Sequence, residues 1–162
     1  MKGNDSFKSI GIKSIDATHA KELYKLLSDS NSEYLQHFTP FEISENSIFT
    51  ILSNAILDRY FGVFIDKTLV GFYMLRGFDE GYDIPSYGVF ISENYSFLGL
   101  AALTIQRSIA FCKVNNIKRL MLKVHPDNLT AMILYESFGF KAEGIDPKNN
   151  NLIYYKDFKI RM

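Results

Sequence analysis

Hydrophobic positions in the first half of the chain change their spacing several times. Residues 7–15 alternate apolar and polar side chains loosely, as a strand does. Two stretches follow, 16–27 and 44–57, in which apolar residues recur three and four positions apart, and this spacing predicts helices. Residues 60–65 and 69–75 are then predicted strands, because the short polar turn between them is typical of a hairpin.

The second half of the chain alternates strands with helices. Its predicted elements are a loop at 77–85, a strand at 86–91, a helix at 99–114, a strand at 119–124, a helix at 128–137 and a final hairpin of 140–144 and 152–160. The resulting order, βααβββαβαββ, places a meander before the strand–helix alternation. We therefore predict an α/β (α+β) fold with a central mixed β-sheet of about six to seven strands flanked by four helices.

Length and charge narrow the classes of function. The 162 residues fit one domain spanning 1–162, and 47% of them are apolar, which is enough for a buried core. Eighteen Lys and Arg residues balance eighteen Asp and Glu residues, so the formal net charge is zero. A general nucleic-acid binder carries a basic excess, so we expect no nucleic-acid partner and favour a small neutral or zwitterionic one.

Cysteine content and hydropathy indicate a cytoplasmic protein. Cys112 is the single cysteine, so no intramolecular disulfide forms, in agreement with a reducing compartment. The N-terminal segment lacks the apolar core of a secretory signal, and no apolar run approaches the ~20 residues of a membrane span. We expect no membrane partner. The sequence leaves the oligomeric state open, a homodimer included.

Residues 96–101 connect a predicted strand to a predicted helix through a glycine-containing turn. A helix N-terminus presents unpaired backbone N–H groups and the positive end of the peptide dipoles, which together suit a phosphate. Gly99 and Ala101 are small and let the backbone approach a pyrophosphate closely. An ordinary connection into a packing helix would have the same appearance.

A second motif lies downstream. Its residues follow the spacing N-x-x-A-x-x-x-Y-x-x-x-G-F: Asn128, Ala131, Tyr135, Gly139 and Phe140. With this motif the chain resembles the GNAT superfamily of N-acetyltransferases, whose other motif is [RQ]-x-x-G-x-[GA]. Gly99 and Ala101 match the [RQ]-x-x-G-x-[GA] motif, whereas Ser96 stands where the family prefers Arg or Gln.

The resemblance implies a GNAT-like fold and an enzyme that moves an acetyl group from acetyl-CoA to an amine. It implies that Ile91 pairs its backbone with the pantetheine arm as an added strand would. It also implies that Asn128 contacts the arm near its thiol, and that Tyr135 points its hydroxyl at the sulfur. The residues whose backbone would hold the pyrophosphate are Ser96, Phe97, Leu98, Gly99, Leu100 and Ala101.

Three of these residues also have structural interpretations. Asn128 can cap the helix that it begins, and this role is compatible with contact to the CoA arm. Tyr135 can be a half-buried core tyrosine. Gly139 can end a helix where a positive φ is required.

Leaving-group chemistry gives Tyr135 a role as general acid, because a positioned phenol can protonate the departing thiolate. The general base is not determined by the sequence. Glu80 and Asp83, in the acidic loop 77–85, are our candidate catalytic bases, although a solvated acidic turn explains them too. His125 and ordered water are further candidates. No metal is expected, because the three histidines are scattered and no cysteine pair exists.

The acceptor is predicted to be a small molecule with a primary amine. Residues 71–91 look similar to GNAT members that acetylate amino-sugar nucleotides, which makes this the first class to consider. A protein N-terminus or a lysine is the alternative acceptor, and it would need a more open groove. A non-catalytic acyl-CoA-binding regulatory module is the alternative from another class, although such a module would not need an acid at Tyr135.

Overall fold

A seven-stranded mixed sheet forms the centre of the molecule in a computed structural model that describes residues 6–38 and 40–159. Its strands lie in the order β1-β2-β3-β4-β5-β7-β6. Their bounds are β1 Ile10–Ser14, β2 Arg59–Ile65, β3 Thr68–Arg76, β4 Ser86–Ile91, β5 Arg119–Val124, β6 Lys141–Ile145 and β7 Leu152–Asp157. Neighbouring strands are antiparallel except for β4 and β5, which are parallel. The predicted mixed sheet is confirmed.

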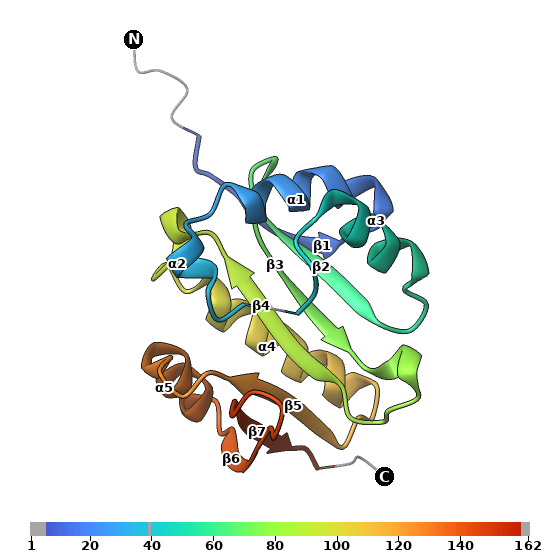
Figure 1. The fold of residues 1–162 in the computed structure, drawn as a ribbon, viewed down its shortest axis with the longest axis vertical. Helices are drawn as coiled ribbons and strands as arrows, with labels where there is room; N and C mark the ends of the chain where they lie inside the picture. Colours follow the sequence, from blue (N-terminus) through green and yellow to red (C-terminus); the bar gives the residue numbers. More distant parts are fainter. Residues whose placement is uncertain (1–5, 39, 160–162) are drawn as a thin grey trace.

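Helices cover both faces of the sheet, as Figure 1 shows. The α-helices are α1 Ala20–Ser28, α2 Ser32–Leu35, α3 Glu45–Asn54, α4 Leu100–Val114 and α5 Leu129–Ser137, and the 3-10 turns are η1 Ala17–His19, η2 Phe78–Glu80 and η3 Glu93–Tyr95. Helices α1 and α3 pack on one face of β1–β4, while α4 and the Tyr135 end of α5 pack with the opposite face. The four longer helices match the predicted four.

Strand β3 shows why the sheet is buried on both sides. Its residues from Leu69 to Leu75 are all buried, and their side chains are divided between the two cores. Phe72 and Met74 belong to the core beneath α1 and α3, whereas Tyr73 and Leu75 belong to the core beneath α4. A strand covered on both faces reads as a continuous apolar run, which is how its sequence reads.

Side-chain caps set the starts of the helices where the sequence predicts them. The Asp16 carboxylate accepts from the Thr18 N–H at 2.9 Å at the start of η1, which runs directly into α1. The Ser44 hydroxyl accepts from the Ser47 N–H at 3.1 Å at the start of α3. Each contact satisfies an N–H group that has no partner within the helix.

Several predicted boundaries are wrong. The first strand begins at Ile10, not at residue 7, and α3 ends at Asn54, not at residue 57. The short helix α2 was not predicted. Strand β7 ends at Asp157, and the last residue of the predicted final strand, Ile160, lies outside the described residues. Within the described ranges, no helix is long and apolar enough to cross a membrane.

Candidate active site

Strands β4 and β5 diverge soon after they meet. Their pairing is limited to Ser86 with Met121 and Tyr87 with Leu122. Beyond these pairs a cleft of about 1260 Å³ opens between the strands, and both of them line it. An ordinary small-molecule pocket measures about 300–1,000 Å³, so this cleft has room for two ligands.

The alternation of side chains along β4 divides the cleft lining between the two faces of the sheet. Tyr87 and Ile91 lie in the core beneath α4, whereas Phe90, on the same strand, lies in the core beneath α1 and α3. All three line the cleft. Because successive strand residues point to opposite faces, the cleft is lined on both sides of the sheet. We call these the α4 side and the α1/α3 side.

The loop before α4 forms one end of the cleft on the α4 side. Phe97 and Gly99 have positive φ angles, 60° and 84°. Leu103 is the first residue near this helix end whose N–H has an acceptor, the Gly99 carbonyl oxygen at 3.0 Å. Among the described residues, none accepts a hydrogen bond from the N–H groups of residues 97–102. These six donors, at the positive end of a 15-residue helix, suit an anion.

Gly99 leaves space in front of these donors. A Cβ built on Gly99 would meet no atom within 4 Å, and the residue lines the cleft. The predicted row of donors is therefore present, with one difference at its start. The Ser96 N–H donates to the Glu93 carbonyl oxygen at 3.2 Å, and the Ser96 hydroxyl donates to the same oxygen at 2.7 Å. Ser96 lines the cleft but uses its own donors locally.

Tyr135 lies on α5 at the junction of the two strands. Its ring packs edge-on against Tyr87 and Phe140, at centroid distances of 6.2 and 6.1 Å. The side chain is 8% exposed and lines the cleft. No described residue is hydrogen-bonded to its hydroxyl. Every fully buried side-chain N or O atom of the described chain has a hydrogen-bond partner, so the unpartnered Tyr135 hydroxyl must be accessible and reach the cleft. Burial raises the pKa of Tyr135 to about 12, so the phenol keeps its proton at neutral pH.

Asn128 caps α5 and also lines the cleft. Its Oδ1 accepts from the Ala131 N–H at 3.2 Å, which confirms the structural role that the sequence predicts. The rest of the side chain faces the same cleft as Tyr135. Gly139, just past the end of α5, has a φ angle of 88°, as predicted for a helix end.

The predicted acidic loop separates its carboxylates into different environments. Glu80 is exposed and lines the cleft. Asp83 is exposed too, but it is not among the described residues that line the cleft. Asp79 accepts from the backbone N–H groups of Ile56, Leu57 and Asp58, at 3.0, 2.7 and 3.3 Å, and these hydrogen bonds lower its pKa. Asp79 therefore has a structural role.

Two histidines meet at the cleft, and the sequence analysis did not anticipate their contact. The rings of His37 and His125 stack with centroids 3.8 Å apart and planes 19° apart. Both residues line the cleft. His37 comes from the segment after α2 and His125 from the end of β5, so no local spacing could predict their contact.

A lysine on β5 forms an ion pair with a carboxylate in the turn between β6 and β7. The Lys123 ammonium group lies 2.9 Å from the Asp146 carboxylate, and its hydrogen bond lowers the pKa of Asp146. Lys123, Asp146 and Lys148 all line the cleft. No group of three or more histidine, cysteine or acidic residues that could hold a metal occurs in the part of the chain that the structure describes.

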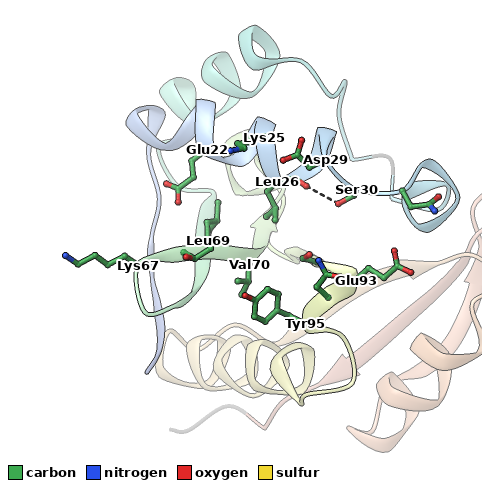
Figure 2. Close-up of a pocket in the computed structure, with 14 residues that line it drawn as sticks. Glu22, Lys25, Leu26, Asp29, Ser30, Lys67, Leu69, Val70, Glu93 and Tyr95 are labelled. Atoms are coloured by element: carbon green, nitrogen blue, oxygen red, sulfur yellow. Dashed lines mark hydrogen bonds between the residues drawn. The ribbon is translucent and has the colours of Figure 1, made fainter. Parts of the chain in front are cut away.

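A second hollow, of about 730 Å³, lies beside the end of α1 and is shown in Figure 2. Three carboxylates and two ammonium groups line it: Glu22, Asp29, Glu93, Lys25 and Lys67. Tyr95 lines both hollows. The excess of carboxylates in this second hollow does not favour an anion.

No curated protein sequence matches the chain at a significant level. A GNAT-family acetyltransferase from Streptococcus pneumoniae has a similar structure, with a TM-score of 0.74 and 19% identity over 93% of this chain and 100% of its own. The PaiA N-acetyltransferase from Thermoplasma acidophilum, solved with coenzyme A, has a TM-score of 0.75 and 18% identity over 93% of this chain and 99% of its own.

A protein-modifying enzyme is also among the similar structures. The ribosomal-protein-S5-alanine acetyltransferase from Vibrio fischeri has a TM-score of 0.76 and 18% identity, over 94% of each chain. At these identities the structures establish the shared fold. The model of the acetyltransferase (GNAT) family matches residues 20–140 directly. The chain thus belongs to the GNAT family and is an acetyl-CoA-dependent acetyltransferase.

Proposed function

We propose that this enzyme transfers the acetyl group of acetyl-CoA to the primary amine of a small molecule, with Tyr135 as general acid. The observation that carries the proposal is the cleft through the sheet. One end has a row of free backbone donors, its middle has a protonated tyrosine, and its lining extends to the opposite face. This arrangement can receive a cosubstrate on one side and an acceptor on the other.

The residues on the α4 side fit coenzyme A. The N–H groups from Phe97 to Ala102 would bind the pyrophosphate, in the space left open at Gly99. Ser96 contributes a bend and no long polar side chain, so affinity rests on the backbone donors. Ile91 and Asn128 line the cleft between this loop and Tyr135, where the pantetheine arm would lie. The Thermoplasma acidophilum relative, solved with coenzyme A, supports this assignment.

Tyr135 is suited to protonate the leaving thiolate. Acetyl-CoA supplies a thioester carbonyl that a neutral amine can attack. A thiol has an ordinary pKa near ~8.5, so its departure is faster when a nearby acid supplies a proton. With a pKa of about 12, the Tyr135 phenol carries its proton at neutral pH. A purely acyl-CoA-binding regulatory module would have no use for it.

A small acceptor agrees with the lining on the α1/α3 side. Four large side chains line the cleft, those of His37, Phe38, Tyr82 and Ile84, and Phe38 packs with the core on the α1/α3 side. An amino-sugar nucleotide is the first class to test, in view of the likeness at residues 71–91. Transfer to a protein N-terminus is the second candidate, because an S5-alanine acetyltransferase has a similar structure.

Of the two carboxylates suggested as general base, Glu80 is the better placed. It lines the cleft, whereas Asp83 is exposed outside it. We treat residues 1–162 as a single catalytic domain, and the family match at 20–140 supports this for most of the chain. Because acetyl-CoA is consumed inside cells, the proposed reaction also implies a cytoplasmic enzyme.

An acceptor panel tests the proposal. Amino-sugar nucleotides, free amino sugars, polyamines and peptide N-termini are offered with acetyl-CoA, and free thiol is measured. We expect turnover of one small-amine class. Turnover of peptide N-termini alone would reverse the order of the two candidates. Acetyl-CoA at a hundred times a micromolar dissociation constant should stabilise the fold by about 2.7 kcal/mol. Absence of the corresponding thermal shift would contradict the binding site.

A further inference from the structure

The stacked pair of His37 and His125 lies on the acceptor side of the cleft. Phe38, next to His37, packs against Phe72 and Phe90 at centroid distances of 5.6 and 5.4 Å. Those two rings belong to the core beneath α1 and α3, so His37 enters the cleft from the face opposite α4. The other ring of the pair comes from the residue that follows β5.

Hydrogen bonding distinguishes the two rings. The Nδ1 of His125 accepts from the Asp127 backbone N–H at 3.1 Å. A neutral His125 that accepts at Nδ1 has its proton on Nε2. The lone pair on Nδ1 is then occupied by the hydrogen bond from the Asp127 N–H. No described residue makes a hydrogen bond to the His37 ring, which is exposed and lines the cleft. A neutral His37 therefore offers one free lone pair.

The surroundings hold His37 on rigid structure. The Arg76 Nη1 donates to the Pro40 carbonyl oxygen at 3.0 Å, and the Arg76 guanidinium lies 6.0 Å from the centre of the Phe41 ring. Together with the packing of Phe38, these contacts tie the segment that follows His37 to the sheet. The stack on His125 then fixes the orientation of the imidazole itself.

We propose that His37 accepts the proton from the acceptor ammonium group, with His125 as a positioning residue. This inference rests on the proposed function. Histidine is the side chain that ordinarily exchanges protons near neutral pH, and a base is most effective in that range.

The step balances in atoms and charge. An ammonium proton moves to the free nitrogen of His37, and the neutral amine attacks the thioester carbon. The C–N bond forms, the C–S bond breaks, and Tyr135 gives its proton to the sulfur. The second proton on the attacking nitrogen returns to the Tyr135 oxygen, and His37 releases its proton to solvent.

Other ionisable groups also line the cleft near the pair. Asp127 has a carboxylate oxygen 3.8 Å from His125 Nδ1. The other charged or titratable side chains lining the cleft are Arg76, Glu80, Tyr82, Tyr87, Tyr95, Lys123, Tyr135, Asp146, Lys148 and Tyr155. Lys123 and Asp146 neutralise each other. Glu80 is the remaining carboxylate of the described lining, so it is the alternative base that the test must distinguish from His37.

Phenylalanine separates the two roles, because it keeps an aromatic ring for stacking and cannot take a proton. We expect His37→Phe to lower kcat/KM at neutral pH on the order of 10²-fold, with recovery as the pH rises toward the pKa of the amine. His125→Phe keeps the ring that stacks on His37, so its pH profile should stay that of the wild type. Glu80→Gln tests the alternative base, and the same pH dependence is expected of it. Acetyl-CoA affinity should be unchanged in all three.

Several results would overturn the assignment. One is a wild-type pH profile in His37→Phe, and another is the predicted loss in His125→Phe or Glu80→Gln instead. An active wild type with either result leaves the proposed function intact, whereas a wild type inactive on every amine overturns both. Histidine NMR gives an independent readout. It should show the Nε2–H form of His125, and the Nδ1–H form would contradict the hydrogen bond that distinguishes the two rings.

Discussion

Gly99 and Gly81 have nearly the same backbone conformation and very different surroundings. Their φ angles are 84° and 90°, and a Cβ on either one would meet no atom within 4 Å. Gly99 lines the cleft before α4, whereas Gly81 lies in the exposed acidic loop and is not among the lining residues. The pair therefore separates backbone strain from an effect on binding.

We predict that Gly99→Ala and Gly81→Ala lower the free energy of unfolding by a similar amount, about 1–2 kcal/mol, since both place a side chain in the left-handed region. Only Gly99→Ala should weaken acetyl-CoA binding, and Gly99→Glu should abolish it through repulsion of the phosphates. Urea denaturation and calorimetric titration measure the two effects. Equal acetyl-CoA affinity in both alanine variants would show that the phosphates bind elsewhere.

At the scale of elements, Asp79 joins two segments that are distant in sequence. Its carboxylate in η2 accepts three backbone hydrogen bonds from residues 56–58, just before β2. These bonds take the place of further helical turns and explain why α3 ends at Asn54. They also hold the loop that carries Glu80.

We predict that Asp79→Ala destabilises the protein, whereas Asp83→Ala leaves its stability unchanged. Backbone hydrogen bonds lower the pKa of Asp79 from 3.8 in the folded state. The stability that it contributes is therefore complete above pH 3.8 and is lost as the pH falls through the lowered value. Thermal unfolding at neutral and acid pH measures this. A wild-type midpoint in Asp79→Ala at neutral pH would refute the structural role.

The elements that sequence patterns predict well are those with local causes. Apolar spacing locates α1 and α3, and Ser44 caps the start of α3. The donor row before α4 is also local, because it follows from a turn leading into a helix. The His37–His125 stack and the Asp79 contacts join segments far apart in sequence, so no spacing indicates them. Likewise, no sequence pattern indicates that Glu80 lines the cleft and Asp83 does not, because this depends on how the loop folds.

For the molecule as a whole, buried acidic groups set the response to alkali. Burial raises the pKa of Tyr60 and Tyr135 from 10.0 to about 12, and that of Cys112 from 9.0 to about 12. A raised folded-state value means that their contribution to stability is complete below the unfolded-state pKa and is lost as the pH rises through about 12.

We predict that the urea midpoint falls as the pH increases above 9.0. Cys112 is fully buried, so a thiol reagent should modify it only when the protein unfolds. Labelling at increasing urea concentrations, with the unfolded chain as the control, follows both effects. Rapid labelling of the native protein would show that the core beneath α4 opens more readily than this packing implies.

The central claim is that acetyl transfer takes place in the cleft between β4 and β5, with Tyr135 as the acid. Its most direct test is the single-turnover rate of Tyr135→Phe, measured when chemistry limits the reaction. Phe keeps the packing against Tyr87 and Phe140 and removes only the hydroxyl. The matched control is Tyr154→Phe, whose hydroxyl donates to Glu136 at 3.1 Å and is not part of the described cleft lining.

We predict a loss on the order of 10²-fold in the single-turnover rate of Tyr135→Phe, with acetyl-CoA affinity changed by only a few-fold. Tyr154→Phe should retain the wild-type rate. An acyl donor with a more acidic leaving thiol should narrow the difference between Tyr135→Phe and the wild type, because it needs less protonation. An unchanged single-turnover rate in Tyr135→Phe would contradict the account.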